Sequence, residues 1–399
     1  MIMKNKQRIG LFGYGVVGHG LYEIITGNTQ LSIELVKICA KHPDKKRDIP
    51  LDNFTFDRND ILNDDSIDLI VEAIDDADAS FEIVSTALKS GKNVVSANKK
   101  MISEHLEELV SLQKENGTSL LYEASACASI PIVRTLEEFY DNDLLNSVSG
   151  IFNGSTNFIL TKIFNENKDY DLALKQAQDL GFVERNPDLD IVGYDALYKL
   201  LIVTAHAYGI FVKPEDVVVH GIQYISKYDI EYAQERGAKV KQIATVRKFG
   251  QNQIAIYVIP QFVFPEHDLY DVEYEFNAVT VEAAFSQSQF FKGKGAGGHP
   301  TGFAMFADIS AMSYNYKYEY KKHLSGPQAR FSNDYVIEVY FRYYDEKNLA
   351  HFNFEEISAR YTSKEFSYVI GTISMSALHE KLSVLNTADI FVVSTGRLG

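Results

Sequence analysis

Asp195 and Lys199 are the residues whose types and spacing most clearly suggest proton chemistry. They lie four positions apart in residues 192–208, a stretch that we expect to be helical, so both side chains share one helix face. Residues 200–205 are mostly apolar, which predicts that the helix enters a core and shields the pair. A shielded lysine beside a carboxylate can hold a proton or pass it to a reacting oxygen. An ordinary structural salt bridge is the alternative, and it is the commoner case for such a pair.

A glycine-rich turn near the N-terminus predicts a dinucleotide site. Residues 8–12 have the pattern of a short apolar strand, Gly13, Gly15 and Gly18 follow with the spacing GxGxxG, and a helical pattern continues from Val16. In this setting the first glycine permits a tight turn, the second lets a pyrophosphate approach the backbone, and the third lets helix and strand pack closely. The helix N-terminus then faces the phosphates. A merely structural glycine turn is the weaker alternative.

The end of the second expected strand, residues 33–39, bears on the choice of coenzyme. An Asp or Glu there would bind the ribose 2′-hydroxyl and favour NAD. The sequence continues instead with Lys41, Lys45, Lys46 and Arg47, a basic cluster that suits a 2′-phosphate. We therefore expect NADP or NAD as cofactor, with NADP favoured; Asp44 within the cluster argues the other way, and a solvated basic loop is the alternative.

Composition excludes several classes of function. The 39 basic and 54 acidic residues give a net charge of −15, which argues against nucleic acid or an anionic membrane as a partner. Cys39 and Cys127 are too few for a disulfide framework, and no apolar run is long enough to span a membrane. We find no signal peptide and expect a cytoplasmic enzyme with a small-molecule substrate.

Strand and helix patterns alternate up to about residue 125, which predicts an α/β fold with a Rossmann-type, doubly wound parallel sheet. The strands are expected at residues 8–12, 33–39, 68–74, 93–96 and 119–122, with helices at 80–90 and 104–116. After residue 145 the pattern predicts an α+β substrate and dimerisation domain. Its helices are expected at 155–165, 169–180 and 192–208, its strands at 147–152, 240–249, 253–264 and 277–284, with a later helix at 301–314.

With these elements in place, the chain resembles homoserine dehydrogenase from about residue 8 to 315. With no aspartokinase region before Arg8, it resembles the monofunctional form. The acidic stretch that ends at Lys199, interrupted by Pro187, is the most diagnostic block. The other matching blocks are residues 13–18, 96–99, 123–125, 130–131, 150–157 and 293–301.

The resemblance implies NAD(P)H-dependent, reversible reduction of L-aspartate 4-semialdehyde to L-homoserine. Lys199 and Lys99 match the family's two active-site lysines, and Asp195 would orient Lys199. Hydride delivery to an aldehyde develops negative charge on its oxygen, and lysine ammonium groups can stabilise that oxygen and supply the proton. Lys99 follows the expected strand 93–96, at the edge where open α/β sheets bind ligands.

Contacts to the substrate are implied in the same way. Glu184 and Asp190 match positions that bind its amino end, and a carboxylate is what an ammonium requires. The family's substrate loop corresponds to Asn153, Gly154 and Thr156. The alternative for that loop is a strand-to-helix turn with Ser155 or Thr156 as the helix N-cap.

The resemblance also implies the coenzyme and ion contacts. The coenzyme residues are Gly13, Tyr14, Gly15, Val16, Val17, Gly18, Lys41, Asn98, Lys99, Gly295, Gly297 and Gly298, although a flexible loop is the alternative for the last three. Backbone carbonyls of Glu123, Ala126 and Ala128 are expected to hold a monovalent cation, Na⁺ or K⁺.

Three places depart from the family pattern. Asp75 and Asp76 replace a usual Gly-Gly pair, and they would repel phosphate unless they point away. Residues 126–129 replace a glycine-rich segment, and Phe182 replaces a usual tyrosine. Cys127 lies in that segment, and we interpret it as a small buried hydrophobe rather than a nucleophile.

The C-terminal region resembles the second half of an ACT domain, with strands expected at 335–344, 366–373 and 390–394 and a helix at 375–385. It lacks the usual Pro-Gly turn, so we expect a degenerate ACT-like α+β region. We expect four parts: 1–145 (nucleotide-binding), 146–300 (substrate-binding and dimerisation), 301–328 (returning helix) and 329–399 (ACT-like). A homodimer or homotetramer is expected.

Two other classes of function fit part of the sequence. A non-catalytic NADP-sensing regulator would keep Gly13, Gly15 and Gly18, but it has no use for two lysines and their carboxylates. Another NAD(P) oxidoreductase acting on an amino-acid carbonyl would share the architecture, but it is not expected to carry the acids before Lys199.

Overall fold

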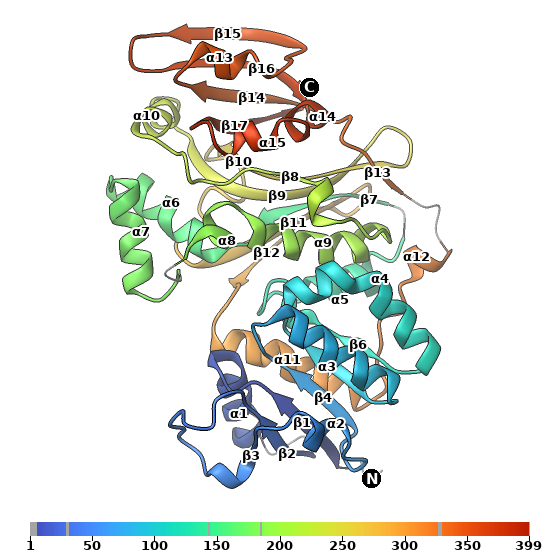
Figure 1. Ribbon diagram of the computed structural model, residues 1–399. Coiled ribbons are helices and arrows are strands. Elements are labelled where there is room, and N and C mark those ends of the chain that lie inside the picture. Colours follow the sequence, from blue (N-terminus) through green and yellow to red (C-terminus); the bar gives the residue numbers. More distant parts are fainter. Residues whose placement is uncertain (1–5, 29–31, 143, 184–185, 326–328, 399) are drawn as a thin grey trace. The chain divides into compact units, whose positions relative to one another are not determined.

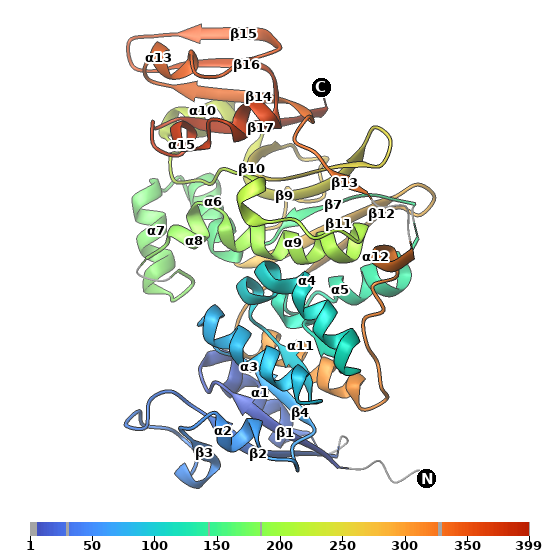
Figure 2. The ribbon, with the colours of Figure 1, turned by 45° about the vertical axis from the view of Figure 1, so that its right-hand side comes forward.

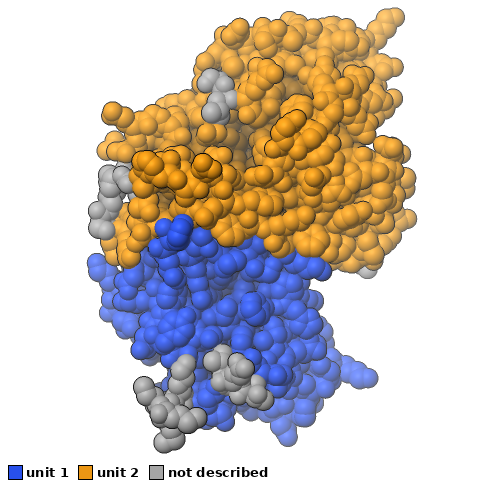
Figure 3. Space-filling model, turned by 180° about the vertical axis from the view of Figure 1, so that it is seen from behind, with its two compact units in different colours: residues 1–139, 294–320 blue, residues 140–293, 321–399 orange. Residues whose placement is uncertain are grey.

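The structure is a computed structural model, shown from two directions in Figure 1 and Figure 2. It describes residues 6–28, 32–142, 144–183, 186–325 and 329–398. The chain forms two compact units, coloured in Figure 3: unit 1 is residues 1–139 and 294–320, and unit 2 is residues 140–293 and 321–399. None of the helices in the described stretches has the length and apolar character that a membrane span requires.

Unit 1 is built on a six-stranded sheet in the order β3-β2-β1-β4-β5-β6, and all its pairings are parallel. Its strands are β1 (Gln7–Phe12), β2 (Ile33–Cys39), β3 (Phe54–Thr55), β4 (Leu69–Glu72), β5 (Asn93–Ser96) and β6 (Leu120–Leu121). The order runs outward from β1 and β4 in opposite directions, and in such sheets ligands bind at the carboxyl ends of those two strands. The predicted parallel, doubly wound sheet is confirmed.

Helices flank the strands of unit 1. They are α1 (Val16–Gly27), α2 (Asn59–Leu62), α3 (Ala77–Lys89), α4 (Lys99–Asn116), α5 (Ile132–Arg134) and α11 (Gly298–Met312), with the 3₁₀ turns η1 (Leu51–Asn53) and η2 (Glu123–Ser125) and the π-helical segment η3 (Thr135–Phe139). Helix α4 begins five residues before the predicted start at 104, because Asn98 caps it: its Oδ1 accepts a hydrogen bond of 2.9 Å from the Met101 backbone N–H. Helix α1 packs closely on α11, since a Cβ atom at Gly20 would lie 2.4 Å from backbone of Gly298.

Unit 2 is built on an eleven-stranded mixed sheet whose main path is β12-β11-β7-β9-β10-β17-β14-β16-β15, with β8 and β13 also paired to β10. The strands are β7 (Leu145–Ile151), β8 (Val218–Val219), β9 (Lys239–Phe249), β10 (Gln253–Val263), β11 (Phe276–Ala283), β12 (Gln287–Lys294), β13 (Arg330–Phe331), β14 (Val336–Tyr343), β15 (Glu356–Thr362), β16 (Ser367–Ser374) and β17 (Phe391–Leu398). The last four join the same sheet because β17 pairs in parallel with β10 at Ser394 and Gln261.

Helix α9 (Tyr194–Tyr208) is the central helix of unit 2, and residues 195–208 are all buried, as the apolar run predicted. It packs on β7, β9 and β10, and α6 (Gly154–Glu166) packs on β9 and β11. The remaining helices are α7 (Tyr170–Asp179), α8 (Asp188–Ile191), η4 (Pro214–Asp216), α10 (Lys227–Glu235), α12 (Lys321–Ser325), α13 (Glu346–Leu349), α14 (Met375–His379) and α15 (Leu382–Leu385).

The C-terminal prediction needs two corrections. The single helix expected at 375–385 is wrong: the backbone leaves the helical region at Lys381 (φ −115°, ψ 19°), so two short helices, α14 and α15, form instead. Strand β15 was missed because all seven of its residues are exposed at the sheet edge, and a strand without a buried face has no apolar alternation to detect.

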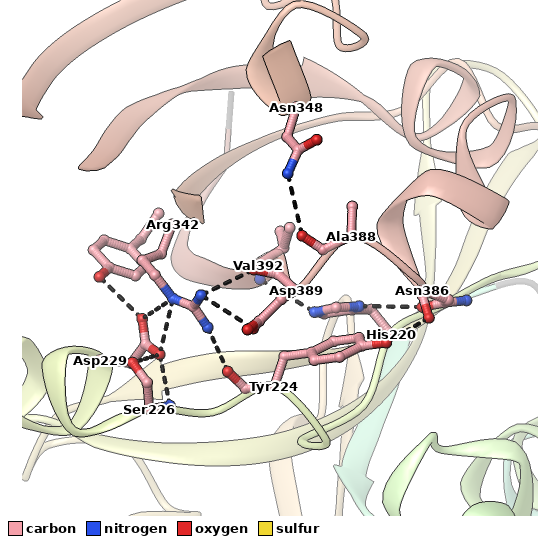
Figure 4. A network of polar contacts seen from close by, with 11 residues as sticks. His220, Tyr224, Ser226, Asp229, Arg342, Asn348, Asn386, Ala388, Asp389 and Val392 are labelled. Atoms are coloured by element: carbon pink, nitrogen blue, oxygen red, sulfur yellow. Dashed lines mark hydrogen bonds and ion pairs between the residues drawn. The ribbon is translucent and has the colours of Figure 1, made fainter. Parts of the chain in front are cut away.

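Arg342 on β14 anchors this C-terminal part of unit 2 (Figure 4). Its side chain is fully buried, and its Nε lies 3.3 Å from a carboxylate oxygen of Asp229 at the start of α10. The other guanidinium nitrogens donate to the backbone carbonyls of Asp389, at 2.9 Å, and Tyr224. Asp229 also accepts from the Ser226 backbone N–H at 2.8 Å. The guanidinium therefore joins β14, α10 and the lead into β17.

His220 adds a second buried polar contact to this region (Figure 4). Burial lowers its pKa to about 4, so the ring is neutral at physiological pH. Its Nε2 accepts a hydrogen bond of 3.2 Å from the Val392 backbone N–H, which places the ring proton on Nδ1, 3.4 Å from Asn386 Oδ1.

Asp229→Ala tests the buried ion pair, because it leaves the Arg342 charge buried without its carboxylate. We expect the free energy of unfolding to fall by about 3–5 kcal/mol. The fall should be measurable as lower midpoints of thermal and urea unfolding. Asp169→Ala is the control, since Asp169 is an exposed helix N-cap whose side chain makes no capping hydrogen bond. Equal midpoints for the two variants would contradict the role of the pair.

Candidate active site

The glycine turn of unit 1 has the geometry of a phosphate cradle. Gly13 has φ +94°, and a Cβ atom there would lie 2.4 Å from the Ala73 carbonyl oxygen, while one at Gly18 would lie 2.2 Å from the Gly13 carbonyl oxygen. A Cβ atom at Gly15 would meet nothing within 4 Å. Thus Gly13 and Gly18 are required by packing, whereas the space at Gly15 is open to a ligand.

Helix α1 begins beside this open space. Its N-cap, Gly15, has no side chain to accept hydrogen bonds from the first-turn N–H groups of the helix, and helix starts of this kind can bind anions. The turn opens on a cavity of about 810 Å³. Besides Gly13, Tyr14 and Gly15 of the turn, the cavity is lined by Phe12, Cys39, Ala40, Lys41, His42, Lys45, Arg47, Phe56, Asp57, Arg58, Asn59, Ala73, Ile74, Asp75, Asp76, Ala79 and Ile83.

The basic loop after β2 is held in shape by Arg47. Its guanidinium donates to the Lys45 and His42 carbonyls, at 2.9 and 2.6 Å, and lies 4.6 Å from the centre of the Phe54 ring. Tyr14, the second residue of the turn, donates from its hydroxyl to Asp48 at 3.1 Å. These contacts place Lys41 and Lys45 at the cavity wall.

Asp75 and Asp76 also line this cavity, and the structure accounts for one of them. The Asp76 carboxylate caps α3 by accepting a hydrogen bond of 3.1 Å from the Ala79 backbone N–H. Its negative charge is thus stabilised by the N-terminus of a helix. Because this hydrogen bond and the helix N-terminus offset its charge, Asp76 should repel a phosphate less than an uncapped carboxylate would.

Asn98 and Lys99 follow β5 at the carboxyl edge of the sheet, as predicted. Asn98 both caps α4 and donates from Nδ2 to the Ile74 carbonyl at 3.0 Å, so it ties the end of β5 to the segment after β4. Lys99 is the first residue of α4 and is partly buried. Lys100 is exposed and lies 3.9 Å from Glu104, which fits a solvated neighbour.

The glycines of the segment 295–298 lie at the start of α11. Gly297 is the N-cap with φ +116°, and Gly298 is the first residue of the helix. A Cβ atom at Gly298 would lie 2.8 Å from the Val16 carbonyl oxygen, so this glycine lets α11 approach the start of α1. Gly298 also lines a second cavity, together with Tyr14, Gly15 and Val16.

Glu123 organises the segment expected to hold a cation. Its carboxylate accepts from the Val133 and Arg134 backbone N–H groups, at 2.8 and 2.9 Å. Burial, with Asp308 nearby, raises the pKa of Glu123 to about 8. Ala128 has φ +44°, a left-handed backbone conformation that is more usual for glycine. Separately, the described residues contain no cluster of three or more His, Cys, Asp or Glu side chains suited to a metal.

In unit 2 the predicted lysine–carboxylate pair is formed and buried. Lys199 Nζ donates to Asp195 Oδ2 at 2.8 Å and to the Phe152 carbonyl at 2.8 Å, and both side chains are more than nine-tenths buried. An ammonium has three N–H bonds, so two are used here and one remains for a ligand.

Asn153 connects this pair to the acidic segment. Its Nδ2 donates to Asp195 Oδ2 and to Asp190 Oδ1, each at 2.7 Å, while its Oδ1 accepts from the Thr156 backbone N–H at 2.7 Å. Asn153, and not Ser155 or Thr156, is therefore the N-cap of α6, which corrects the alternative reading of this loop. The asparagine holds the two carboxylates in place, a role the sequence did not suggest.

The other predicted substrate residues are distributed around this network. Gly154 begins α6, and a Cβ atom there would lie 2.6 Å from the Glu275 carbonyl oxygen, so the close approach needs glycine. Thr156 bonds to Asn153 also through its hydroxyl, at 3.0 Å. Glu184 lies outside the described residues. Phe182 packs its ring on Phe158, with the centres 4.9 Å apart.

A glycine cradle at the switch point of a parallel sheet and a buried lysine held by a carboxylate are both typical of nicotinamide-nucleotide oxidoreductases. The family model for the NAD-binding domain of homoserine dehydrogenase matches residues 13–123, and the model for homoserine dehydrogenase matches residues 131–310.

Individual relatives agree with these models. The homoserine dehydrogenase of Bacillus subtilis is 34% identical over 348 residues, 82% of this chain and 80% of the relative. That of Helicobacter pylori is 33% identical over 314 residues, 77% and 74% of the two chains. The solved homoserine dehydrogenase of S. aureus has a TM-score of 0.74 at 28% identity and covers 98% of this chain and 100% of its own. The enzyme from Thiobacillus denitrificans shares the fold, with a TM-score of 0.84 at 24% identity over 98% and 99% of the two chains.

The chain belongs to the homoserine dehydrogenase family. Its activity is the NAD(P)-dependent interconversion of L-aspartate 4-semialdehyde and L-homoserine, a step of amino-acid biosynthesis.

Gly15→Val tests the cradle. Since the added side chain meets no protein atom near the Cβ position, we expect the thermal midpoint to stay close to that of the unsubstituted chain while NADPH binding is lost. Gly13→Ala is the contrasting variant: its Cβ atom would clash with the Ala73 carbonyl, so it should lower the thermal midpoint. Titration calorimetry with NADPH is the readout, and unchanged affinity in Gly15→Val would remove the cradle from the coenzyme site.

Proposed function

We propose that Lys199 is the proton donor and oxyanion partner for the aldehyde oxygen of L-aspartate 4-semialdehyde. The observation that carries this proposal is its buried ammonium, held by Asp195 and the Phe152 carbonyl with one N–H left over. A bound nicotinamide coenzyme would supply the hydride that reduces the aldehyde carbon. As the oxygen gains charge, the Lys199 N–H stabilises it and then transfers a proton, which gives the alcohol.

Asp195 and Asn153 are proposed to position the reacting groups. The Asp195 carboxylate balances the Lys199 charge, and the Asn153 amide fixes the orientation of that carboxylate. The same amide orients Asp190, which is proposed to bind the substrate ammonium together with Glu184. Gly154 and Thr156 are proposed to shape the loop on which the substrate lies.

Lys99 is proposed as the second active-site lysine. It stands at the carboxyl end of β5, at the start of α4, where open α/β sheets place their ligands. From there its ammonium would add to the stabilisation of the developing negative charge.

NADP is proposed as the favoured coenzyme, with NAD as the other candidate. The basic wall formed by Lys41, Lys45 and Arg47, without an acid at the end of β2, suits a 2′-phosphate. A hyperthermophilic archaeal homoserine dehydrogenase, 26% identical and covering 81% of this chain, has been solved in complex with NADPH. The glycine turn, Asn98, Lys99 and the glycines 295, 297 and 298 are the proposed remaining contacts.

We also propose a cation site, a cellular location and oligomeric state, an ACT-like region and a division into domains. Backbone carbonyls of Glu123, Ala126 and Ala128 bind Na⁺ or K⁺; the chain acts in the cytoplasm as a homodimer or homotetramer; and residues 329–399 form a degenerate ACT-like region. The chain is likewise proposed to divide into the four functional parts expected from the sequence, with boundaries after residues 145, 300 and 328.

Lys199→Ala should lower kcat by roughly 10²- to 10⁴-fold, because it removes the proton donor, while NADPH binds with little change. Steady-state kinetics of aldehyde reduction and NADPH titration measure the two effects. Lys100→Ala, at an exposed lysine beside Glu104, is the control and should keep its kcat. Normal turnover of Lys199→Ala would exclude it as proton donor.

Oxidation of L-homoserine, followed by the absorbance of the reduced coenzyme, tests the activity and its preferences together. We expect a higher kcat/KM with NADP than with NAD, and a higher rate when Na⁺ or K⁺ is present. Equal rates in a buffer free of both ions would contradict the cation site. A preference for NAD would contradict the role given to the basic loop.

A further inference from the structure

Asn277 on β11 contacts the same carbonyl group as Lys199. Its side chain is fully buried, and its Nδ2 donates to the Phe152 carbonyl oxygen at 2.9 Å. Lys199 Nζ donates to that oxygen at 2.8 Å. A carbonyl oxygen has two lone pairs, so these two donors together fix the direction in which the Phe152 carbonyl points.

The other end of the Asn277 amide points to a role besides folding. Among the described residues its Oδ1 has no hydrogen-bond partner, although it is buried. An unpaired buried acceptor costs stability, and an apolar side chain of similar size would avoid that cost. Stability alone therefore does not favour asparagine at this position.

The chain just before Asn277 is held by a second buried amide. Asn157 on α6 donates from Nδ2 to the carbonyls of Val272, Tyr274 and Phe276, at 3.1, 2.9 and 3.2 Å. Glu275 lies in the same segment, and its carbonyl oxygen would be 2.6 Å from a Cβ atom at Gly154. The segment 272–276 is thus fixed against the start of α6, and Asn277 follows it directly.

Lys241 on β9 completes this arrangement. Its Nζ is buried and donates to Asn157 Oδ1 at 3.0 Å and to the Val272 carbonyl at 2.5 Å. Burial, with the Lys239 ammonium nearby, lowers the pKa of Lys241 to about 7; Glu273 and Asp271 act in the opposite direction. An amine keeps two N–H bonds when it is neutral, so both hydrogen bonds can persist on either side of that pKa.

We propose that Asn277 is a positioning residue, which aims the Lys199 ammonium through the Phe152 carbonyl, and that Asn157 and Lys241 hold Asn277 in register for this task. The path of hydrogen bonds leads from Lys241 on β9 through Asn157 on α6 to the segment 272–276, and from Asn277, which follows that segment, through the Phe152 carbonyl to Lys199 on α9. This inference rests on the proposed role of Lys199 in proton transfer.

The test compares Asn277→Ala with Thr280→Val. Thr280 lies on the same strand, is buried, and has a hydroxyl without a hydrogen-bond partner among the described residues, so Thr280→Val is a matched control outside the path. We expect Asn277→Ala to lower kcat about tenfold or more, with the Kd of NADPH within about twofold and the thermal midpoint little changed. Thr280→Val should keep its kcat.

A double-mutant cycle with Lys199→Ala separates positioning from a general structural effect. If Asn277 acts through Lys199, Asn277→Ala lowers kcat no further once Lys199 is alanine. The same fold loss in both backgrounds, or full activity of Asn277→Ala, would overturn the proposal. Full activity of Lys199→Ala alone would instead count against the proposed proton donor.

If Asn277→Ala fails to fold, Asn277→Ser and Lys241→Met test the same proposal. Asn277→Ser retains a hydroxyl donor and should keep more activity than Asn277→Ala, or measurable activity where that variant is lost. Lys241→Met should lower kcat less than Asn277→Ala, because it acts two contacts farther away. An inactive but folded Asn277→Ser, with Lys241→Met fully active, would contradict the path.

Discussion

A buried ammonium must be held by acceptors, since an unpaired charge in a protein interior is very costly. Lys199 satisfies this constraint with one carboxylate and one backbone carbonyl. Asp195 lies one helical turn before it on α9, which fixes the spacing, and Phe152 lies at the end of β7. The position of the Lys199 ammonium therefore depends both on α9, which carries Asp195, and on the turn from β7 into α6, which carries the Phe152 carbonyl.

The constraint in unit 1 is steric rather than electrostatic. Gly13 and Gly18 are needed because backbone atoms lie where a Cβ atom would be, and only then can α1 begin beside an open cavity. The loop after β2 presents basic groups to the same cavity, with Arg47 held on Phe54. Unit 1 contains the glycine turn, and unit 2 contains Lys199 with Asp195.

The features that follow from local spacing could be predicted from the sequence. The alternation of strand and helix patterns predicted the parallel sheet, and the cradle at Gly13, Gly15 and Gly18 and the pairing of Asp195 with Lys199 depend on residues close in the chain; the structure has all three. The hydrogen bonds from Asn153 to Asp190 and Asp195 were missed because these partners lie about forty positions away, whereas its capping of α6 is a local contact with Thr156 that the sequence analysis assigned to Ser155 or Thr156. Asn277 and Arg342 were missed for the same reason, since a strand residue gives no local signal of a partner far away in the chain.

The most direct measurement is the rate of hydride transfer in a single turnover of Asp195→Asn, observed by stopped-flow with saturating NADPH and aldehyde. The substitution keeps the shape of the side chain and removes the charge that holds Lys199. If the pair sets the position of the proton donor, the rate should fall by at least about tenfold while NADPH affinity stays the same. A rate equal to that of the unsubstituted enzyme would contradict the view that the reaction depends on this pair.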